Sequence, residues 1–448
     1  MKRHYAAVDL GAGSGRIMLG TLDGNSFSFR EIHRFPNRII PIGGRKCWDW
    51  ETLSENVLSR LKKLKAETGN APFSVSCDSW AQDFGLLGPD GELLAPVVSY
   101  RDELLSGMPE KIGRILAAVG LRASVSKIST LSQLRYLSET APELLEKSAA
   151  LLNVADLLHF SLCGTASQNW SFATVSQMFD FERGTWDSGL LKTLGLPDHF
   201  LLEPSAGKIL GTTGEGIRVI SGIGHDTACA FHGAGSRSDE LVLSLGTWAM
   251  AGSVLPPDSL LEPLSPPFGY FGILPGKYVV FRSMPGQWLQ DGCVAQWKKE
   301  GLFTSHREFD RQVEESVCKA VFELDSPELS APENMPETIR SLCRKNETEV
   351  PESPGDVGRA IIRSFVRTFL DATRKLERMY GKRFKRLLTV GGGTANRPLM
   401  KELSKHFKVR TGAAEAAALG NIAVQMELDG VPEPEIGRIL ASRTKAVV

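Results

Sequence analysis

Asp226 is the residue whose surroundings in the sequence best suit acid–base chemistry. It follows Gly222, Gly224 and His225, and residues 227–230 after it predict the first turn of a helix. The helix dipole and the free backbone N–H groups of such a turn stabilise an ionised carboxylate. Asp226 could therefore accept a proton from a substrate hydroxyl. Aspartate is also a leading helix N-cap residue, so the local pattern alone leaves a purely structural role open.

Two further segments, one in each half of the chain, share a pattern that suits phosphate binding. Residues 7–19 and 241–251 each contain an apolar strand that ends at a glycine with a serine or threonine nearby, followed by a second apolar strand. A glycine turn can direct several backbone N–H groups at one point. Neither segment has the Gly-Lys-Ser/Thr sequence of a Walker loop, and a single such turn is usually a plain hairpin. Two copies predict a duplicated fold that holds one nucleotide from both sides.

The side chains beside these turns suit a magnesium-bound phosphate. Asp9 ends the first strand and can hold Mg²⁺, directly or through water. Arg16 can reach a phosphate or sugar oxygen, and Ser244 and Thr247 add hydroxyl groups at the second turn. The triple glycine at 391–393 lies between a strand and a helix, as nucleotide-binding loops often do. A turn aspartate and a surface arginine remain the structural alternatives for the first two residues.

A polar and aromatic group follows the buried strand predicted at residues 73–77. It contains Asp78, Trp80, Gln82 and Asp83. An aromatic face beside carboxylate and amide groups suits sugar hydroxyls, although many domain interfaces carry the same combination. This segment is therefore the candidate sugar-binding wall.

Composition limits the class of protein. The 448 residues exceed what one hydrophobic core supports and predict two domains. The 52 basic and 52 acidic side chains balance, which argues against a nucleic-acid partner. We expect no signal peptide and no membrane span. The seven cysteines form no Cys-x-x-Cys pair, so the sequence predicts scattered thiols in a cytoplasmic protein.

Hydrophobic periodicity and turn residues predict the elements that position these groups. In the first half we expect a hairpin at 17–35 around Asp23-Gly24, a helix at 51–68, a strand at 84–87 paired with 93–98, a helical segment at 106–165, and strands within 209–220. In the second half we expect strands at 241–254, a hairpin around 275–277, a surface loop or irregular helix pair at 325–356, a helix at 357–380, a strand at 386–390, a helix after Asn396 and a helix at 413–427.

Taken together, these motifs resemble the FGGY carbohydrate kinases of the actin-like ATPase fold, with the rhamnulokinase branch as the most similar. The segments that carry the resemblance are Asp9–Arg16, Trp48-Asp49, Asp78–Phe84, Tyr100–Asp102, Gly222–Thr227, Ser244–Trp248, Val390–Asn396 and Glu415–Asn421. The resemblance implies an α/β fold of two RNase H-like domains with a central cleft. It places the sugar on an N-terminal domain at 1–235 and the nucleotide on a C-terminal domain at 236–448.

The resemblance also implies the chemistry and the residues that perform it. We expect an ATP- and Mg²⁺-dependent kinase, a monomer or homodimer, that phosphorylates a primary hydroxyl of a ketose. L-rhamnulose is the first candidate. Fuculose, ribulose, xylulose and sedoheptulose remain open, and an actin- or chaperone-like ATPase is less favoured. Asp226 would be the catalytic base and Asp9 the magnesium ligand. The expected ATP-binding residues are Ala12, Gly13, Ser14, Gly15, Arg16, Thr247, Gln290, Gly391, Gly392, Gly393 and Asn396; the expected sugar-binding residues are Ala81, Gln82, Asp83, His225, Asp226, Thr227 and Ser283.

The chain departs from the rhamnulokinase pattern at a few of these positions. Ala81 and Gln82 stand where glycine and valine are usual, and Ser283 stands where a sugar-contacting asparagine is expected. Near Trp288 the usual nucleotide-side glutamine is displaced to Gln290 or Asp291. These changes leave phosphoryl transfer intact and leave the identity of the sugar open.

Overall fold

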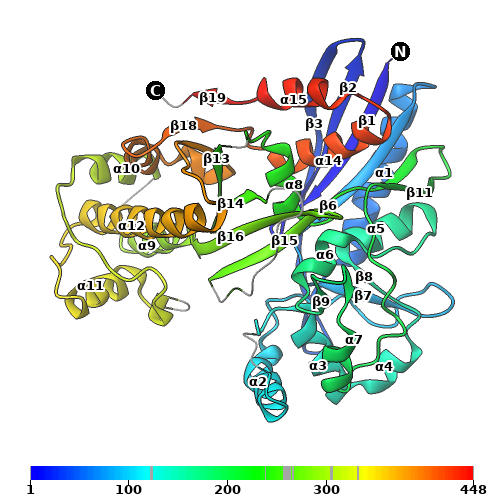
Figure 1. The fold of residues 1–448 in the computed structure, drawn as a ribbon, viewed down its shortest axis with the longest axis horizontal. Helices are drawn as coiled ribbons and strands as arrows, with labels where there is room; N and C mark the ends of the chain where they lie inside the picture. Colours follow the sequence, from blue (N-terminus) through cyan, green and yellow to red (C-terminus); the bar gives the residue numbers. More distant parts are fainter. Residues whose placement is uncertain are drawn as a thin grey trace.

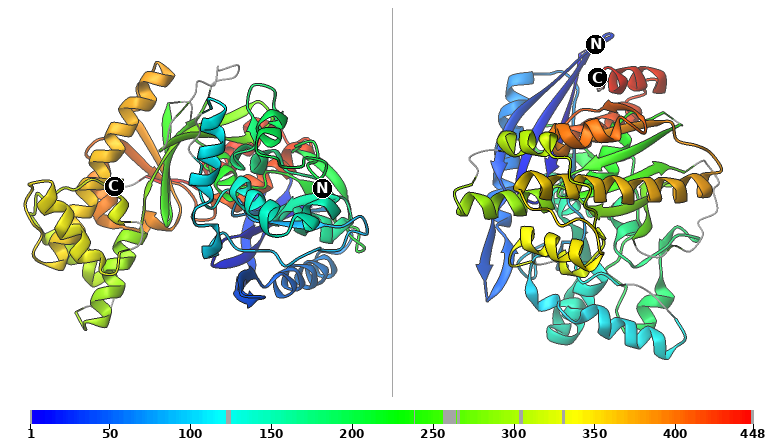
Figure 2. Two further views of the ribbon diagram at one scale, coloured as in Figure 1. Left: turned by 90° about the horizontal axis from the view of Figure 1, so that it is seen from below. Right: turned by 90° about the vertical axis from the view of Figure 1, so that its left-hand side faces the viewer.

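The computed structural model describes residues 2–121, 125–237, 239–255, 264, 267–302, 306–329 and 332–446. Figures 1 and 2 show two lobes, each built around one large twisted sheet with helices against it. Within the described residues, no helix is both long enough and apolar enough to span a membrane.

The N-terminal lobe contains a six-stranded sheet with the strand order β11-β12-β6-β1-β2-β3. Its strands are β1 (Arg3–Leu10), β2 (Ser14–Asp23), β3 (Ser26–Pro36), β6 (Phe73–Ser79), β11 (Lys208–Thr212) and β12 (Arg218–Ser221). Three small ladders add β4 (Ile39–Ile42) with β5 (Arg45–Trp48), β7 (Phe84–Leu87) with β8 (Ala150–Asn153), and β9 (Phe179–Asp180) with β10 (Thr185–Trp186). The helices are η1 (Glu103–Leu105), α1 (Trp50–Thr68), α2 (Met108–Ala118), α3 (Thr130–Thr140), α4 (Pro142–Lys147), α5 (Val154–Cys163), α6 (Trp170–Val175), α7 (Ser188–Thr193) and α8 (Asp226–Gly233).

The C-terminal lobe contains a seven-stranded sheet with the strand order β15-β16-β14-β13-β17-β18-β19. Its strands are β13 (Glu240–Leu245), β14 (Trp248–Val254), β15 (Phe268–Leu274), β16 (Lys277–Pro285), β17 (Arg386–Val390), β18 (Lys408–Thr411) and β19 (Lys445–Ala446). The helices are α9 (Trp288–Lys299), α10 (His306–Glu315), η2 (Pro327–Leu329), α11 (Met335–Lys345), α12 (Pro354–Tyr380), η3 (Gly392–Ala395), α13 (Arg397–Leu403), α14 (Ala416–Leu428) and α15 (Glu433–Ala441).

The two sheets repeat one topology. The order β3-β2-β1-β6-β12 in the first sheet matches β16-β14-β13-β17-β18 in the second. In each sheet the first strand pairs antiparallel with the second and parallel with the strand on its other side. The duplication that the two glycine turns predicted is therefore confirmed, and each turn joins the first two strands of its sheet.

Two helices cross between the lobes. Helix α8 follows the first sheet in sequence, but its Ala228 and Phe231 lie in a core cluster with strands β13 and β17 of the second sheet. Helix α14 belongs to the second half, but its Leu419 and Ile422 pack on β1 and β2, and Figure 1 shows this C-terminal segment beside those strands. The two helices touch through their backbones, because a Cβ atom on Gly420 would lie 2.0 Å from the carbonyl oxygen of Cys229. The domain boundary between residues 235 and 236 therefore stays a prediction. In the structure, α8 packs on the C-terminal lobe and α14 packs on the N-terminal lobe.

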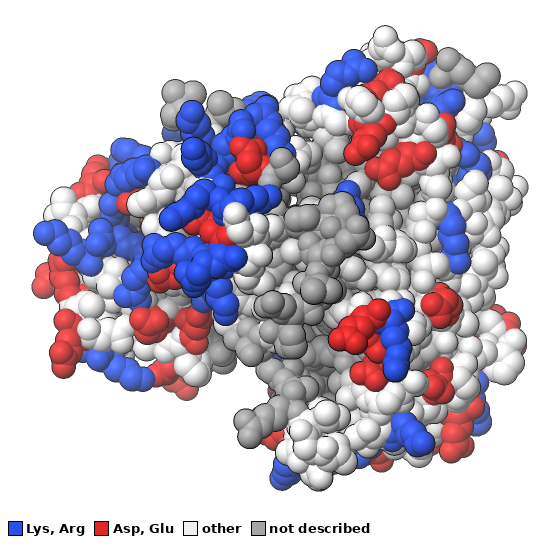
Figure 3. Space-filling model, viewed as in Figure 1, with Lys and Arg blue, Asp and Glu red and all other residues white. Residues whose placement is uncertain are grey.

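The longest helix, α12, follows the amphipathic pattern that the sequence predicted. Ser353 and Asp356 form a capping box at its start, and Ile361, Phe365 and Phe369 are among the residues of its buried face. Its outer face is rich in arginine, and Figure 3 shows lysine and arginine gathered on this lobe. Several of these arginines are paired with acids, as Arg367 is with Glu323 at 2.8 Å.

Two predictions in the first half are corrected. Strand β7 pairs along its length with β8, and only a single bridge joins Leu87 to Leu93. The segment 106–165 is not continuously helical, because β8 lies between α4 and α5. Strand β8 has only four residues, too few for periodicity to distinguish a buried strand from a helix. The segment 325–356 contains η2 and α11, and Ile339 and Cys343 of α11 are fully buried in the core.

Candidate active site

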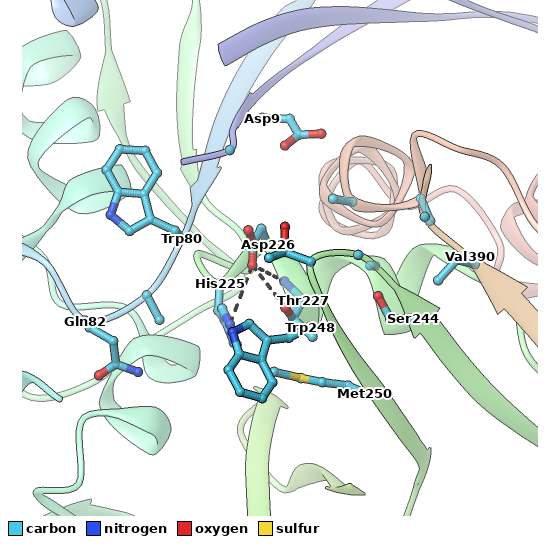
Figure 4. Close-up of a pocket in the computed structure, with 18 of the residues that line it drawn as sticks. Asp9, Trp80, Gln82, His225, Asp226, Thr227, Ser244, Trp248, Met250 and Val390 are labelled. Atoms are coloured by element: carbon cyan, nitrogen blue, oxygen red, sulfur yellow. Dashed lines mark hydrogen bonds and ion pairs between the residues drawn. The ribbon is translucent and has the colours of Figure 1, made fainter. Parts of the chain in front are cut away.

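A cleft of about 500 Å³ lies between the lobes, and both halves of the chain line it. Strands β1 and β6 are parallel neighbours, so Asp9 and Asp78 are register partners at their carboxyl ends. In the second sheet, Ser244 of β13 and Val390 of β17 are the corresponding pair. Ligands of α/β sheets typically bind beyond the carboxyl ends of the strands. Figure 4 shows side chains from both lobes converging on this space.

Asp226 lies in the cleft at the start of α8. Its Oδ1 atom accepts hydrogen bonds from the backbone N–H and the hydroxyl of Thr227. Its side chain is 31% exposed. Burial of the carboxyl group, followed by the charge of Asp9, raises its pKa from 3.8 to about 7, although the bonds from Thr227 oppose the shift. A carboxyl group with a pKa near neutrality suits a general base.

His225 is the N-cap of α8 and lies against Asp226. Its Nε2 atom is 3.6 Å from Asp226 Oδ1. Burial lowers the pKa of His225 to about 4, so the ring is neutral at physiological pH and makes no ion pair. Its Nδ1 atom is buried without a hydrogen-bond partner among the described residues.

Asp9 is held by Arg16 across the first turn. Arg16 donates to Asp9 Oδ2 through Nε at 2.8 Å and approaches the same atom through Nη2 at 2.7 Å. The arrangement leaves Asp9 Oδ1 for a cation or its water. Within the described residues, no three His, Cys, Asp or Glu side chains are grouped to hold a metal ion by themselves. One carboxylate fits Mg²⁺, which keeps several waters and binds through one or two carboxylates and the phosphates of its substrate.

A second acid, Asp78, lies behind Asp9 and is fully buried. Its Oδ2 atom accepts a hydrogen bond of 2.7 Å from Asn421 of α14, and its Oδ1 atom has no partner among the described residues. Burial and the charge of Asp9 raise its pKa well above 3.8. Both effects favour the protonated form of this carboxyl group.

The second turn lies where the cleft meets another hollow. Gly246 and Thr247 line the cleft and also a space of about 360 Å³ on the C-terminal lobe. That space is also lined by Gln287, Gln290, Asp291, Asp310, Gly392, Gly393, Ala395 and Asn396. The triple glycine packs directly on the turn, because a Cβ atom on Gly391 would lie 2.5 Å from the carbonyl oxygen of Leu245. The second turn and the triple glycine therefore lie side by side where the cleft meets the second hollow.

The structure brings most of the predicted site residues together. Asp9, Arg16, Ala81, Gln82, His225, Asp226, Thr227, Thr247 and Gly391 line the cleft, and Gln290, Gly392, Gly393 and Asn396 line the second hollow. Ala12, Gly13, Ser14, Gly15, Asp83 and Ser283 line neither space. Gly11 lines the cleft beside the first turn, and Ser283 pairs in register with Met250, whose side chain does line it.

Asp83 supports the wall of the cleft from behind. Its Oδ2 atom accepts hydrogen bonds from the indole N–H groups of Trp48 at 2.7 Å and Trp80 at 2.9 Å. Its Oδ1 atom accepts one from Gln133 at 3.1 Å. Burial raises the pKa of Asp83 to about 6 despite these bonds. This carboxyl group therefore orients Trp80 toward the cleft and does not reach the cleft itself.

Sequence reasoning missed several residues of the site. Gln287 lines the second hollow one position before Trp288, together with Gln290 and Asp291, which the sequence favoured. Trp248 was not among the expected site residues, but it is 56% exposed and lines the cleft. Its place directly after Gly246-Thr247 was the available signal. Tyr100 and Ile128 also line the cleft from the N-terminal lobe.

Comparison with known families identifies this arrangement. The N-terminal domain of the FGGY family of carbohydrate kinases matches residues 4–235, and the C-terminal domain of the same family matches residues 241–427. The chain belongs to this family. It is an FGGY carbohydrate kinase, and its two lobes and central cleft are those of the actin-like ATPase fold.

Named relatives of this FGGY kinase are similar along nearly its whole length. A rhamnulokinase of Oceanobacillus iheyensis is 28% identical, with 95% of this chain and 93% of the relative covered. A rhamnulokinase of Yersinia pestis is 31% identical, with 94% and 89% covered. A solved structure of a ligand-bound xylulose kinase from Lactobacillus acidophilus superposes with a TM-score of 0.77 at 14% identity, covering 100% of this chain and 93% of that one. The last comparison shows the fold alone.

Proposed function

We propose that this FGGY kinase transfers the γ-phosphoryl group of ATP to a primary hydroxyl of a ketose, with L-rhamnulose as the first candidate. The observation that carries the proposal is the position of Asp226, a carboxyl group with a pKa of about 7 in the cleft between the two glycine turns. The similarity to rhamnulokinases supports the choice of sugar.

In this mechanism Asp226 accepts the proton of the sugar hydroxyl as that oxygen attacks the γ-phosphorus. The neutral ring of His225 donates a hydrogen bond to the sugar and helps to align it. General-base assistance of this kind is typically worth about 10²–10⁴ in rate. Because phosphoryl transfer needs positioning and charge neutralisation more than covalent help, the rest of the site has to orient the two substrates.

Each of the two turns would contact the triphosphate from its own side of the cleft. The backbone around Gly11 and Arg16 faces it from the N-terminal lobe, and Gly246 with the Thr247 hydroxyl faces it from the C-terminal lobe. Mg²⁺ bound beside Asp9, directly or through water, would neutralise charge on the β- and γ-phosphates. The rest of the nucleotide would extend along Gly391–Gly393 toward Gln290 and Asn396 in the second hollow.

This division gives each half of the chain one substrate. Residues 1–235 would hold the sugar against Trp80, Ala81 and Gln82, and residues 236–448 would hold the nucleotide. Closure of the cleft would exclude water, so that ATP hydrolysis without sugar is slow.

The test is release of ADP by the purified protein with Mg²⁺-ATP and each of L-rhamnulose, fuculose, ribulose, xylulose and sedoheptulose. We expect sugar-dependent release, with the highest kcat/KM for L-rhamnulose and a 1-phosphate product identified by phosphorus NMR. If no ketose stimulates ADP release, the proposed reaction is wrong. If another ketose gives the highest kcat/KM, the reaction stands and only the choice of sugar is wrong.

A further inference from the structure

We infer that Gln82 determines sugar specificity, because its side-chain amide donates a hydrogen bond to a sugar oxygen remote from the reacting carbon. The kinase would then select a ketose that carries an oxygen at that position. This inference rests on the proposed function, because it assumes that the sugar hydroxyl lies at Asp226.

The backbone of Gln82 has an unusual conformation. Its φ angle is 83°, in the left-handed region that non-glycine residues rarely adopt. Gln177 and Glu347 are the other non-glycine residues with positive φ among those described, and neither lines the cleft. The carbonyl oxygen of Gln82 accepts hydrogen bonds from Thr130 Oγ1 at 2.9 Å and Gln133 Nε2 at 3.2 Å, which fix this conformation. Strained residues cluster at functional sites, where the surrounding structure holds them in place.

The hydrogen bonds also fix the direction of the side-chain amide. Gln82 Oε1 accepts a hydrogen bond from the backbone N–H of Thr130 at 3.3 Å, in the first turn of α3. The amide nitrogen cannot accept that bond, so the oxygen must face Thr130 and the NH₂ group must face the other way. Among the described residues, Nε2 has no hydrogen-bond partner, and Figure 4 shows it on the inner side of the amide, toward the pocket. Gln82 therefore presents two free N–H donors to a ligand.

The position of Gln82 places these donors at the far end of the sugar. Ser79 bridges to His225, next to the base, and its backbone N–H donates to Gly224 at 2.8 Å. Gln82 follows Ser79 by three residues, which limits the separation of their Cα atoms to roughly 11 Å. Gln82 and Asp226 line the same cleft, so a sugar whose reacting hydroxyl lies at Asp226 can reach Gln82 with its remote carbons.

The wall between these points offers few other donors. Trp80 lines the cleft, but its indole N–H is already bonded to Asp83. Ala81 and Ile128 contribute apolar surface. Tyr100 also lines the cleft, and its hydroxyl accepts a hydrogen bond from Arg101 Nε at 3.2 Å. A sugar oxygen that loses water beside Ala81 has the Gln82 amide as its side-chain donor, and a sugar that lacks this oxygen leaves the amide unsatisfied.

The test combines enzyme variants with sugars that lack single oxygens. L-rhamnulose is 6-deoxy-L-fructose, so L-fructose and L-rhamnulose differ only by the C6 hydroxyl, and 4-deoxy and 5-deoxy ketoses extend the series. For wild type, we expect removal of the contacted oxygen to lower kcat/KM by about tenfold. Gln82→Met should lower kcat/KM by a similar factor for the sugar that carries the contacted oxygen. For the deoxy sugar that lacks this oxygen, the methionine variant should show no further loss of kcat/KM.

Two further variants separate recognition from folding. Gln82→Gly removes the amide and also relieves the strain of the positive φ, so it keeps the loop even if the methionine variant unfolds. The glycine variant should also lose the discrimination between the sugar with the contacted oxygen and the deoxy sugar without it. Gln177→Met is the matched control, because Gln177 has a φ of 67° and its Oε1 atom accepts a hydrogen bond from Ser126 at 2.8 Å outside the cleft. It should keep wild-type discrimination.

The outcomes distinguish this inference from the reaction itself. If Gln82→Met, Gln82→Gly and wild type lose the same factor for every deoxy sugar, Gln82 does not contact the substrate, although the ketose kinase stands. If Gln177→Met changes the discrimination as much as the Gln82 variants do, the effect comes from loop stability and the inference is wrong. A protein that phosphorylates no ketose would overturn the proposed function first and this inference with it.

Discussion

The two glycine turns occupy the same place in two copies of one sheet, but their side chains differ in charge. The first has the sequence Asp9-Leu10-Gly11 and the second has Ser244-Leu245-Gly246. The next parallel strand contributes Asp78 in the first sheet and Val390 in the second. The N-terminal copy thus carries acids where the C-terminal copy carries neutral side chains.

This difference shows how a duplicated frame can bind one ligand asymmetrically. Carboxylates on both turns would repel a triphosphate from two sides, since like charges close together in a partly buried site interact strongly. Acidic groups on one side alone can hold a magnesium ion and accept a proton. The neutral side then leaves backbone N–H groups and a hydroxyl to contact the phosphates directly.

The largest effect should come from Asp226, the acid at the start of α8. Asp226→Asn keeps the shape of the side chain but cannot accept the proton, so we expect kcat to fall at least about a hundredfold. Thermal unfolding and ATP binding, measured by titration calorimetry, should stay close to wild type. An asparagine variant with full turnover would rule out this residue as the base.

Exchanging the turn residues tests the asymmetry itself. Asp9→Ser gives the first turn the chemistry of the second, and we expect the Mg²⁺ concentration needed for half-maximal activity to rise about 10- to 100-fold. Ser244→Asp does the reverse and should raise the KM for ATP by about tenfold or more through charge repulsion. Steady-state kinetics at varied Mg²⁺ and ATP check both. Equal effects of the two variants on both parameters would show that the turns are interchangeable.

The pH profile should report the ionisation of Asp226. Because the base must be ionised and its pKa is about 7, kcat/KM for the sugar should fall about tenfold per unit below pH 7 and level off above it. Asp9 is the second cause of the raised pKa, so Asp9→Ser should move the midpoint to lower pH. A midpoint that is unchanged in this variant would mean that the two acids are not coupled.

The smallest expected effect concerns stability. A folded-state pKa raised from 3.8 to about 7 means that Asp226 contributes its full stability below about pH 4 and loses it as the pH rises through about 7. Asparagine removes this titration. The melting temperature of Asp226→Asn should therefore rise relative to wild type between pH 5 and pH 8, by a modest amount because the side chain is 31% exposed. A difference that is constant with pH would contradict the assigned shift.

Local patterns predicted the frame well. The helices at 51–68 and 357–380 and the strand at 386–390 have clear periodicity or length and lie where the sequence placed them. The glycine turns and the start of α8 were predicted because their residue types restrict the backbone directly. Asp9, Asp226 and Thr247 line one cleft.

The parts that sequence could not predict depend on contacts between distant segments. The bonds of Asp83 to Trp48 and Gln133 join three separate segments, so its polar type suggested a ligand contact instead. The pairing of β7 with β8 and the approach of Gln287 to the second hollow have the same origin. A residue's type indicates which bonds it can make, but tertiary packing decides with which partner.

The exchange of α8 and α14 between the lobes has a consequence for expressing the two halves of the enzyme as separate fragments. A fragment that ends at residue 235 would leave α8 without the strands it packs on, and the fragment that begins at 236 would leave the apolar face of α14 in water. The two fragments should therefore be insoluble when expressed alone and should regain activity when produced together in one cell.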